Sequence, residues 1–354
     1  MFKNRFRQYT WIDVLLVLAQ AVVMIVIAVG LFNTFRTGSY STAQWATLVF
    51  AGLAQGSIYA LIALGYTLVY GILLMINFAH GEVYMAGAFS TVFLAHAFDS
   101  SGFLNNNPLL AILILMVFSA GISTGIALLL ERIAYRPLRN APRLIPLITA
   151  IGASFALQYT FRGLYGTQFR AYPSVTWLSQ TWSIFGFTVP RVQPVVFVSA
   201  LALMFALYFY VERTKTGKAM RAVSEDKDVA RLMGINIDRV IVSTFALGGA
   251  LAGAAGIFNG LFRPAGVYYF MGFFPGIKAF TAAVLGGIGS IPGAMIGGLL
   301  LGLIESLGPN LILEGLGIPG ANQLKDAIAF TILVMILIFR PQGIFGERLA
   351  EKKA

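Results

Sequence analysis

Long apolar runs separated by short polar segments make up almost the whole of this chain. The runs span residues 12–32, 46–74, 83–98, 109–130, 144–161, 194–211, 240–262, 277–304 and 322–339. Most of them approach or exceed the ~20 residues that a helix needs to cross the ~30 Å hydrocarbon core of a bilayer. Their continuity differs from the alternating pattern of membrane strands, and helices satisfy their own backbone hydrogen bonds in lipid. The pattern therefore predicts an all-α polytopic membrane protein.

Composition changes this picture little. Hydrophobic residues make up 58% of the 354 residues, above the roughly 45–50% of soluble domains. Because the runs use almost the whole length, we expect a single transmembrane domain, 1–354. Cysteine is absent, which excludes disulfides and thiolate metal sites, and we expect no metal ion and no cofactor.

Lysine and arginine gather in particular loops, and they do not form the basic stripe of a nucleic-acid-binding protein. Basic residues fill the segment 212–239 and the tail after residue 340, whereas the loop 163–193 contains only Arg170 and Arg191. A further cluster before the fifth run consists of Arg132, Arg136, Arg139 and Arg143. Positively charged loops stay on the cytoplasmic side of a membrane. The pattern predicts that both termini and 212–239 are cytoplasmic.

Both termini can be cytoplasmic only if one of the nine runs fails to cross completely. In the run 277–304, the stretch 286–294 contains four glycines and Pro292 and favours a reversal of the chain. Such a hairpin is tolerated at membrane depth where protein or a water-filled cavity covers its backbone. We predict about eight transmembrane helices plus one re-entrant or broken helical hairpin. The alternative is a kinked full span followed by another crossing near 306–318.

A second interruption, MINFAHGE at 75–82, follows the overlong run 46–74. Broken helices near the membrane midplane are a pointer to a transport site, because unwound backbone and helix ends supply polar groups. The residues that could line a path are Gln55, Ser57, Asn77, His80, Glu82, Gly289 and Ser290. The first two could instead be satisfied against a neighbouring helix, and the cluster at 77–82 could lie at a helix end. Few charges lie deep in the runs, which disfavours an ion-coupled carrier.

Glycines four positions apart recur in the runs and predict close helix packing. The pairs are Gly52/Gly56, Gly121/Gly125, Gly249/Gly253, Gly293/Gly297 and Gly298/Gly302.

The chain lacks the sequence motifs of ATPases and common hydrolases. Gly217-Lys218 has neither the earlier glycine nor the Ser/Thr of a phosphate-binding loop. The stretch 152–155 (GASF) resembles an intramembrane serine protease only distantly, since both histidines precede it. We expect no enzymatic activity and no catalytic residue, so active transport would draw its energy from a separate protein.

The segment 212–239 is the one long, densely charged stretch, with seven Lys/Arg and five Asp/Glu between two apolar runs. Charged side chains are costly inside a bilayer, so this segment must lie in water. There it offers a surface on which another protein can dock.

Three stretches, 52–89, 214–240 and 283–305, together resemble the branched-chain amino acid permeases of bacterial ABC importers. The likeness covers roughly residues 46–340 and is greatest to the permease usually written first of the two in such systems. It implies a subunit of the bacterial plasma (inner) membrane, surrounded by lipid. The implied partners are a second permease, two cytoplasmic ATPases and an extracytoplasmic solute-binding protein.

The same resemblance implies a role for the charged segment. Importer permeases carry a cytoplasmic E-A-A-x-x-x-G pattern on a short helix that docks the ATPase, and Asp228, Val229, Ala230 and Gly234 match its spacing. Arg221 joins them as a coupling candidate. Urea and short-chain amide importers have very similar permeases, so they are the alternative to a branched-chain amino acid importer. A passive channel would not need the docking segment.

Overall fold

The computed structural model describes residues 11–345 except 39, 140, 143, 185, 264 and 341. The residues before 11 and after 345, for which a cytoplasmic location is predicted, lie outside this range. The long helices are α1 (Trp11–Thr37), α2 (Thr42–Leu73), α3 (His80–Ser100), α5 (Pro108–Leu130), α6 (Leu144–Tyr165), α8 (Val192–Arg213), α11 (Ile237–Phe262), α12 (Phe273–Gly286), α13 (Ile291–Gly308) and α14 (Lys325–Phe339).

Shorter elements connect these helices. They are α4 (Phe103–Asn106), α7 (Thr176–Ser179), α9 (Lys215–Glu225), α10 (Lys227–Leu232), the antiparallel strands β1 (Thr181–Ile184) and β2 (Phe187–Pro190), the π-helical turns η1 (Glu131–Tyr135) and η3 (Pro309–Leu313), and the 3-10 turns η2 (Arg136–Leu138) and η4 (Ala321–Leu324).

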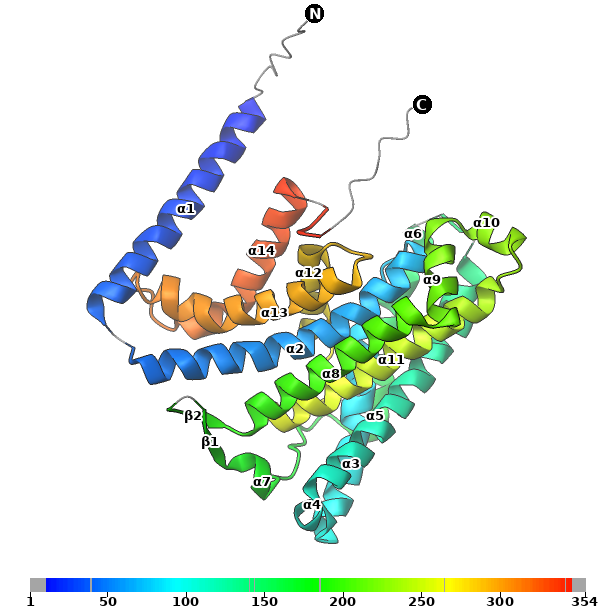
Figure 1. The fold of residues 1–354 in the computed structure, drawn as a ribbon, viewed down its shortest axis with the longest axis horizontal. Helices are drawn as coiled ribbons and strands as arrows, with labels where there is room; N and C mark the ends of the chain where they lie inside the picture. Colours follow the sequence, from blue (N-terminus) through cyan, green and yellow to red (C-terminus); the bar gives the residue numbers. More distant parts are fainter. Residues whose placement is uncertain are drawn as a thin grey trace, which may run out of the picture.

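The predicted fold class is confirmed. In the described part of the chain, eight helices are long and apolar enough to cross a membrane, and α12 is a shorter apolar helix. Figure 1 shows a bundle with two ends: α9 and α10 lie at one, and α4, α7 and the β1–β2 hairpin lie at the other. We call these the α9–α10 end and the β1–β2 end.

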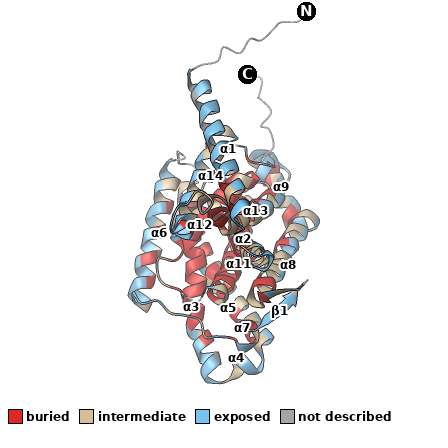
Figure 2. Ribbon diagram, turned by 90° about the vertical axis from the view of Figure 1, so that its left-hand side faces the viewer, coloured by how far each residue is buried: buried red, intermediate tan, exposed pale blue. Residues whose placement is uncertain are grey.

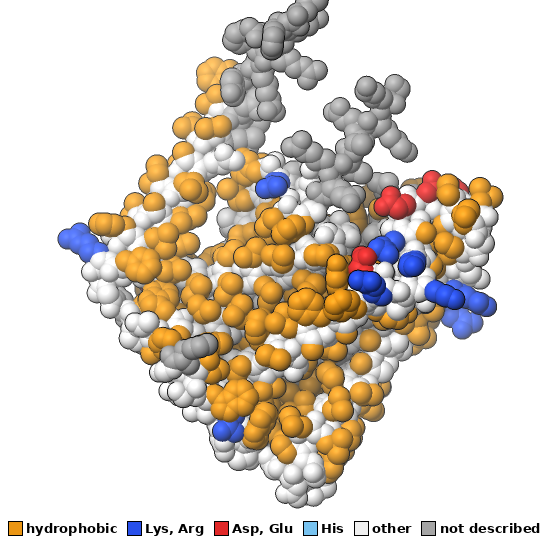
Figure 3. All heavy atoms as spheres, in the orientation of Figure 1, with side chains coloured by type: hydrophobic (Ala, Val, Ile, Leu, Met, Phe, Trp, Pro, Cys, Tyr) orange, Lys and Arg blue, Asp and Glu red, His pale blue; other side chains and the backbone are white. Residues whose placement is uncertain are grey.

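Two central helices, α2 and α11, are largely buried together with α3, and the outer helices carry exposed apolar side chains. In the most apolar 18-residue stretch of each central helix, 72% of the residues are buried. The corresponding share is 11% in α1 and 6% in the segment 321–339, which contains α14 (Figure 2). In water such exposed apolar helices would be unfavourable, but lipid tails are as apolar as leucine side chains. The face of the molecule shown in Figure 3 is accordingly mostly apolar, and most of its charged side chains gather at the α9–α10 end.

The predicted break at 75–82 is confirmed. Helix α2 ends at Leu73, and Leu74 adopts a left-handed conformation with φ 56°. The next helix begins at His80 beside Gly65, since a Cβ placed on that glycine would lie 2.1 Å from the His80 ring. The intervening residues therefore turn back along α2, and α3 begins inside the bundle.

The predicted reversal at 286–294 is also confirmed. Helix α12 ends at Gly286, Gly287 and Gly289 have positive φ, and Ser290 caps α13 by accepting from the Gly293 amide. The open ends of this hairpin meet, because Lys278 Nζ lies 2.8 Å from Glu305 Oε1. The alternative crossing near 306–318 is wrong, since α13 continues through η3 to Leu313 without a separate span.

Helix α12 itself begins inside the bundle, as α3 does. A Cβ on Gly81, in the first turn of α3, would lie 2.4 Å from the Gly272 carbonyl oxygen at the start of α12. The two helix starts thus touch at the centre. A second break, the loop 263–272, precedes α12 and was not predicted.

Glycine pairs hold the hairpin against α2. The backbones of Gly298 and Gly302 meet Ala60 and Gly56, and Gly249 and Gly253 meet α5 in the same way. Around Gly121 and Gly125, in contrast, a Cβ would meet nothing within 4 Å of the described atoms. Four of the five predicted pairs therefore lie at close contacts between helices, Gly293/Gly297 against α12 being the fourth.

We expect Gly298→Ala to destabilise the protein. Its Cβ would lie 2.4 Å from the Ala60 Cα, and overpacking of this kind costs about 1–3 kcal/mol. Gly121→Ala is the matched control, because it adds the same methyl group in open space and should be neutral or stabilising, by up to about 1 kcal/mol. Thermal denaturation in detergent measures both; equal midpoints for the two variants would contradict the assigned contact.

Candidate functional site

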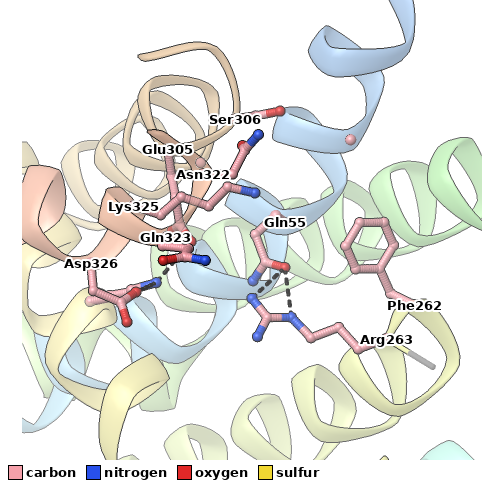
Figure 4. A pocket seen from close by; sticks show the side chains of 12 residues that line it. Gln55, Phe262, Arg263, Glu305, Ser306, Asn322, Gln323, Lys325 and Asp326 are labelled. Carbon is pink, nitrogen blue, oxygen red and sulfur yellow. Dashed lines mark hydrogen bonds and ion pairs between the residues drawn. The ribbon is translucent and has the colours of Figure 1, made fainter. Parts of the chain in front are cut away.

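A polar cavity of about 380 Å³ lies where the open ends of the α12–α13 hairpin meet α2, α11 and α14. Figure 4 shows its lining, which comes from α2 (Ala51, Gln55), the end of α11 (Phe262, Arg263), α12 (Lys278), α13 (Gly302, Glu305, Ser306), and the start of the last helix with the turn before it (Asn322, Gln323, Lys325, Asp326). Small-molecule sites occupy cavities of roughly 300–1,000 Å³, so this one can hold a small solute.

A buried ion triad closes one side of the cavity. Lys278 Nζ lies 2.8 Å from Glu305 Oε1 and 2.5 Å from Asp326 Oδ1, and it also donates to the Tyr59 hydroxyl at 3.4 Å. Lys278 and Glu305 are almost fully buried, whereas the Asp326 side chain is half exposed. Charges in a membrane protein face the interior and pair with one another. The expectation that deep charges are scarce is therefore wrong at this site.

Arg263 occupies the other side. Its guanidinium donates from Nε at 3.3 Å and Nη2 at 3.2 Å to the Gln55 side-chain oxygen. None of the carboxylates in the described chain lies within 4.0 Å of it. The Nε2 of Gln55 and Oε2 of Glu305 are buried without a hydrogen-bond partner among the described residues. Buried polar atoms normally have partners, so the cavity is suited to a polar ligand.

The predicted path residues separate into several places. Gln55 lines the charged cavity, and its role in a path stays a prediction. Ser57 is fully buried and donates to the Ala54 carbonyl oxygen at 2.8 Å, so it is satisfied within its own helix. Gly289 and Ser290 form the turn of the hairpin, where Gly289 lies against Gly71.

The cluster Asn77, His80 and Glu82 surrounds the start of α3. Asn77 Oδ1 accepts from the Tyr135 hydroxyl at 2.8 Å, and the His80 ring packs edge-on against Tyr66. Glu82 Oε1 accepts from Gln158 Nε2 at 2.7 Å and from Ser154 at 3.3 Å. Glu82 also lines a smaller cavity, of about 220 Å³. These residues do not line the larger cavity, and their role in a path stays a prediction.

The sequence pattern did not identify four charged residues of the cavity, Arg263, Lys278, Glu305 and Asp326. A signal for two of them was present, because Lys278 and Glu305 stand at the two ends of the predicted hairpin and carry opposite charges. A hairpin brings its ends together, so these two residues had to meet. The contribution of Arg263 and Asp326 depends on the loops before α12 and α14, which the apolar pattern does not describe.

A second candidate site, α9 and α10, lies at the opposite end of the bundle. Arg221 pairs with Glu212, Asp226 caps α10 by accepting from the Asp228 and Val229 amides, and Asp228 is exposed. Gly234, with φ 83°, ends α10: its amide donates to Arg231 and that of Ile235 donates to Ala230. This pair of bonds is a Schellman motif, in which Gly234 ends α10.

Apolar side chains stand out on this charged surface. Ala230 faces inward and is buried, whereas Val229, Leu232 and Met233 are 55%, 87% and 78% exposed. Contiguous exposed apolar residues rimmed by polar ones mark interaction sites on a water-facing surface. Of the residues matched to the docking pattern, Ala230 is therefore buried and Val229 is exposed. Leu232 and Met233, which no motif had indicated, are exposed beside it.

A bundle of membrane helices in which α3 and α12 begin inside the bundle beside a polar cavity has the features of a membrane permease. A family model described as branched-chain amino acid transport system / permease component matches residues 48–337. The chain belongs to this family.

Curated relatives match most of the chain. The high-affinity branched-chain amino acid transport system permease protein BraD of Pseudomonas aeruginosa is 43% identical over 85% of this chain and 95% of the relative. LivH of Escherichia coli, with the same description, is 41% identical over 86% and 96%. A probable branched-chain amino acid transport permease protein LivH of Methanocaldococcus jannaschii is 29% identical over 83% and 90%.

We expect Lys278→Met to destabilise the protein strongly, because it leaves Glu305 buried without its cation. Breaking a buried ion pair by removing one partner costs about 3–5 kcal/mol. Lys278→Met combined with Glu305→Gln should recover part of this loss, since no uncompensated buried charge remains. Thermal denaturation compares both with Lys218→Met, an exposed lysine on α9 that should tolerate the change. A double variant less stable than Lys278→Met would contradict the pairing.

Proposed function

We propose that this chain is the membrane-spanning permease subunit of an ATP-driven importer for branched-chain amino acids, and that it forms half of the translocation path. The family membership supports the transporter class. The observation that carries the mechanism is the exposed apolar surface of α10 on an otherwise charged loop, because a permease without a phosphate-binding loop must receive its energy through such a surface.

The α9–α10 end is the cytoplasmic end in this proposal. Lys215, Lys218, Arg221 and Arg231 lie there, and basic residues concentrate on the cytoplasmic side. Both termini are then also on the cytoplasmic side. The membrane in this proposal is the plasma (inner) membrane of a bacterium. Arg263, which lines the charged cavity, follows the end of α11 that lies away from α10. In this proposal the cavity receives the solute that an extracytoplasmic binding protein releases on that side.

The segment 212–239 would couple the permease to ATP hydrolysis. Each of two homologous permeases presents its α10 to one cytoplasmic ATPase, with Val229, Leu232 and Met233 as the apolar anchors. Arg221 and Asp228 are placed to form charged contacts around them. The Schellman turn at Gly234 holds α10 at a fixed angle to α11, so that force on α10 reaches the membrane helices.

Branched-chain amino acids are the substrate that the relatives' names support. A neutral amino acid is a zwitterion, and the cavity carries charges of both signs. Urea and short-chain amides, the alternative, are polar but uncharged, and they would leave Arg263 without a charged partner.

We expect Leu232→Asp to abolish ATPase stimulation and transport while the permease remains folded. The side chain is 87% exposed, so its replacement costs little within this chain but places a charge in the docking surface. Ser224→Asp introduces the same charge on the exposed surface of α9 and should retain activity. If the assembly with Leu232→Asp hydrolyses ATP and takes up solute normally, α10 is not the docking helix.

For the substrate, we expect the importer, reconstituted in vesicles with its partners, to take up radiolabelled leucine. Excess isoleucine and valine should compete, because they share the charged groups and an aliphatic side chain; urea should not. Competition by urea alone would overturn the substrate and leave the transporter class standing.

A further inference from the structure

Each of the two charged sides of the cavity contains polar groups that a ligand could bind. Arg263 bonds a neutral amide oxygen, and none of the described carboxylates pairs with it. Opposite it, Lys278 supplies one positive charge to two carboxylates, Glu305 and Asp326. Glu305 is 5% exposed, yet its Oε2 has no hydrogen-bond partner in the described chain. Arg263 therefore lies on one side of the cavity without a carboxylate partner among the described residues. Two carboxylates lie on the other side, where Lys278 and Lys325 are the cations (Figure 4).

We propose that this cavity binds the charged head of a free α-amino acid, with Arg263 holding the carboxylate and Glu305 and Asp326 holding the ammonium group. This assignment rests on the proposed function, because it takes an amino acid to be the cargo. A guanidinium presents donors in a planar fork that matches a carboxylate, and charge-assisted hydrogen bonds are roughly twice as strong as neutral ones. Gln55, which already orients the guanidinium, has a free Nε2 that can donate to the same carboxylate.

Other small solutes fit these charges less well. A simple amine leaves Arg263 unpaired, a simple carboxylate brings no cation to the acidic pair, and urea matches neither side. A charged group that is desolvated without a partner is costly. The complementarity therefore selects a molecule that carries both charges a short distance apart.

The remaining lining explains how an aliphatic side chain would be accommodated. Ala51, Phe262 and Gly302 provide the apolar part of the wall, and the described lining offers no deep pocket of fixed shape for one branched side chain. The cavity would therefore select the charged head group through specific contacts and discriminate little between aliphatic side chains. Leucine, isoleucine and valine should bind with similar affinity.

Cysteine protection tests the site, because the chain has no cysteine of its own. Asn322→Cys places a thiol in the cavity lining, in the assembled transporter purified without its binding protein. The rate of modification by N-ethylmaleimide is followed by the mass of this chain. The probes are L-leucine, 3-methylbutylamine, which lacks the carboxylate, 4-methylpentanoate, which lacks the ammonium group, and urea. Thr42→Cys, at the exposed start of α2 and outside the cavity lining, is the control thiol.

We expect leucine to protect the thiol at a concentration at least tenfold lower than either single-charge analogue, and urea to give no protection. Arg263→Gln should raise the half-protecting concentration of leucine at least tenfold and leave that of 3-methylbutylamine unchanged. Asp326→Asn should do the same for leucine and leave 4-methylpentanoate unchanged. Arg191→Gln, which removes an arginine that stacks on Trp177 and Trp182 at the β1–β2 end, should alter none of these values.

The crossed design separates loss of a contact from collapse of the cavity. If Arg263→Gln weakens leucine and 3-methylbutylamine equally, or if all probes protect alike, the assignment is overturned. Leucine uptake is measured on the same preparation. Normal uptake without protection overturns the site alone, whereas protection without uptake contradicts the proposed transport of leucine and leaves the binding site standing.

Discussion

Interrupted backbone inside a bilayer has to be enclosed by protein, and the rest of this structure follows from that constraint. Unwound segments leave N–H and C=O groups that lipid cannot satisfy. The chain turns back at 74–79 and again at 263–272 and 287–290. Helices α2, α3 and α11 are largely buried and pack around the starts of α3 and α12. Glycines at Gly56, Gly298 and Gly302 allow this enclosure, because any Cβ there would overlap a neighbouring backbone.

The same constraint explains where charge can be placed in the membrane domain. A lysine or carboxylate facing lipid would be unstable, but the open ends of the α12–α13 hairpin form an enclosed polar volume. Lys278 and Glu305 enter it from the two arms of the hairpin, and Asp326 enters from the start of α14. Their pairing ties three helices together and removes most of the cost of burial. Replacing such a triad by apolar residues can be neutral or stabilising, so its presence argues for a role beyond stability.

The sequence predicted most of the membrane spans and two of the three helix breaks, because span length and glycine content depend on local chemistry that each run carries by itself. It did not predict the break at 263–272. The Gly234 helix end was predictable for the same reason. The charged cavity was not, since Arg263 and Asp326 reach it through loops whose path depends on tertiary packing. Leu232 and Met233 read as ordinary apolar residues of a helix until the structure shows that α10 turns them outward. The sequence pattern therefore predicted features that depend on local backbone conformation. It did not predict features that depend on how distant elements pack together.

Helix α11 joins the two ends of the molecule on which the proposed function depends. It begins at Ile237, directly after the turn that ends α10, and Arg263 follows its last residue inside the cavity. At 1.5 Å per residue, its 26 residues span about 39 Å. It packs closely against α2 at Gly248 and against α5 at Gly249 and Gly253, where a Cβ would lie 3.3 Å or less from the neighbouring helix. A displacement of α10 by a partner must therefore either break these contacts or move Arg263 relative to Glu305 and Asp326, and the second outcome changes the spacing of the charges that would hold a zwitterion.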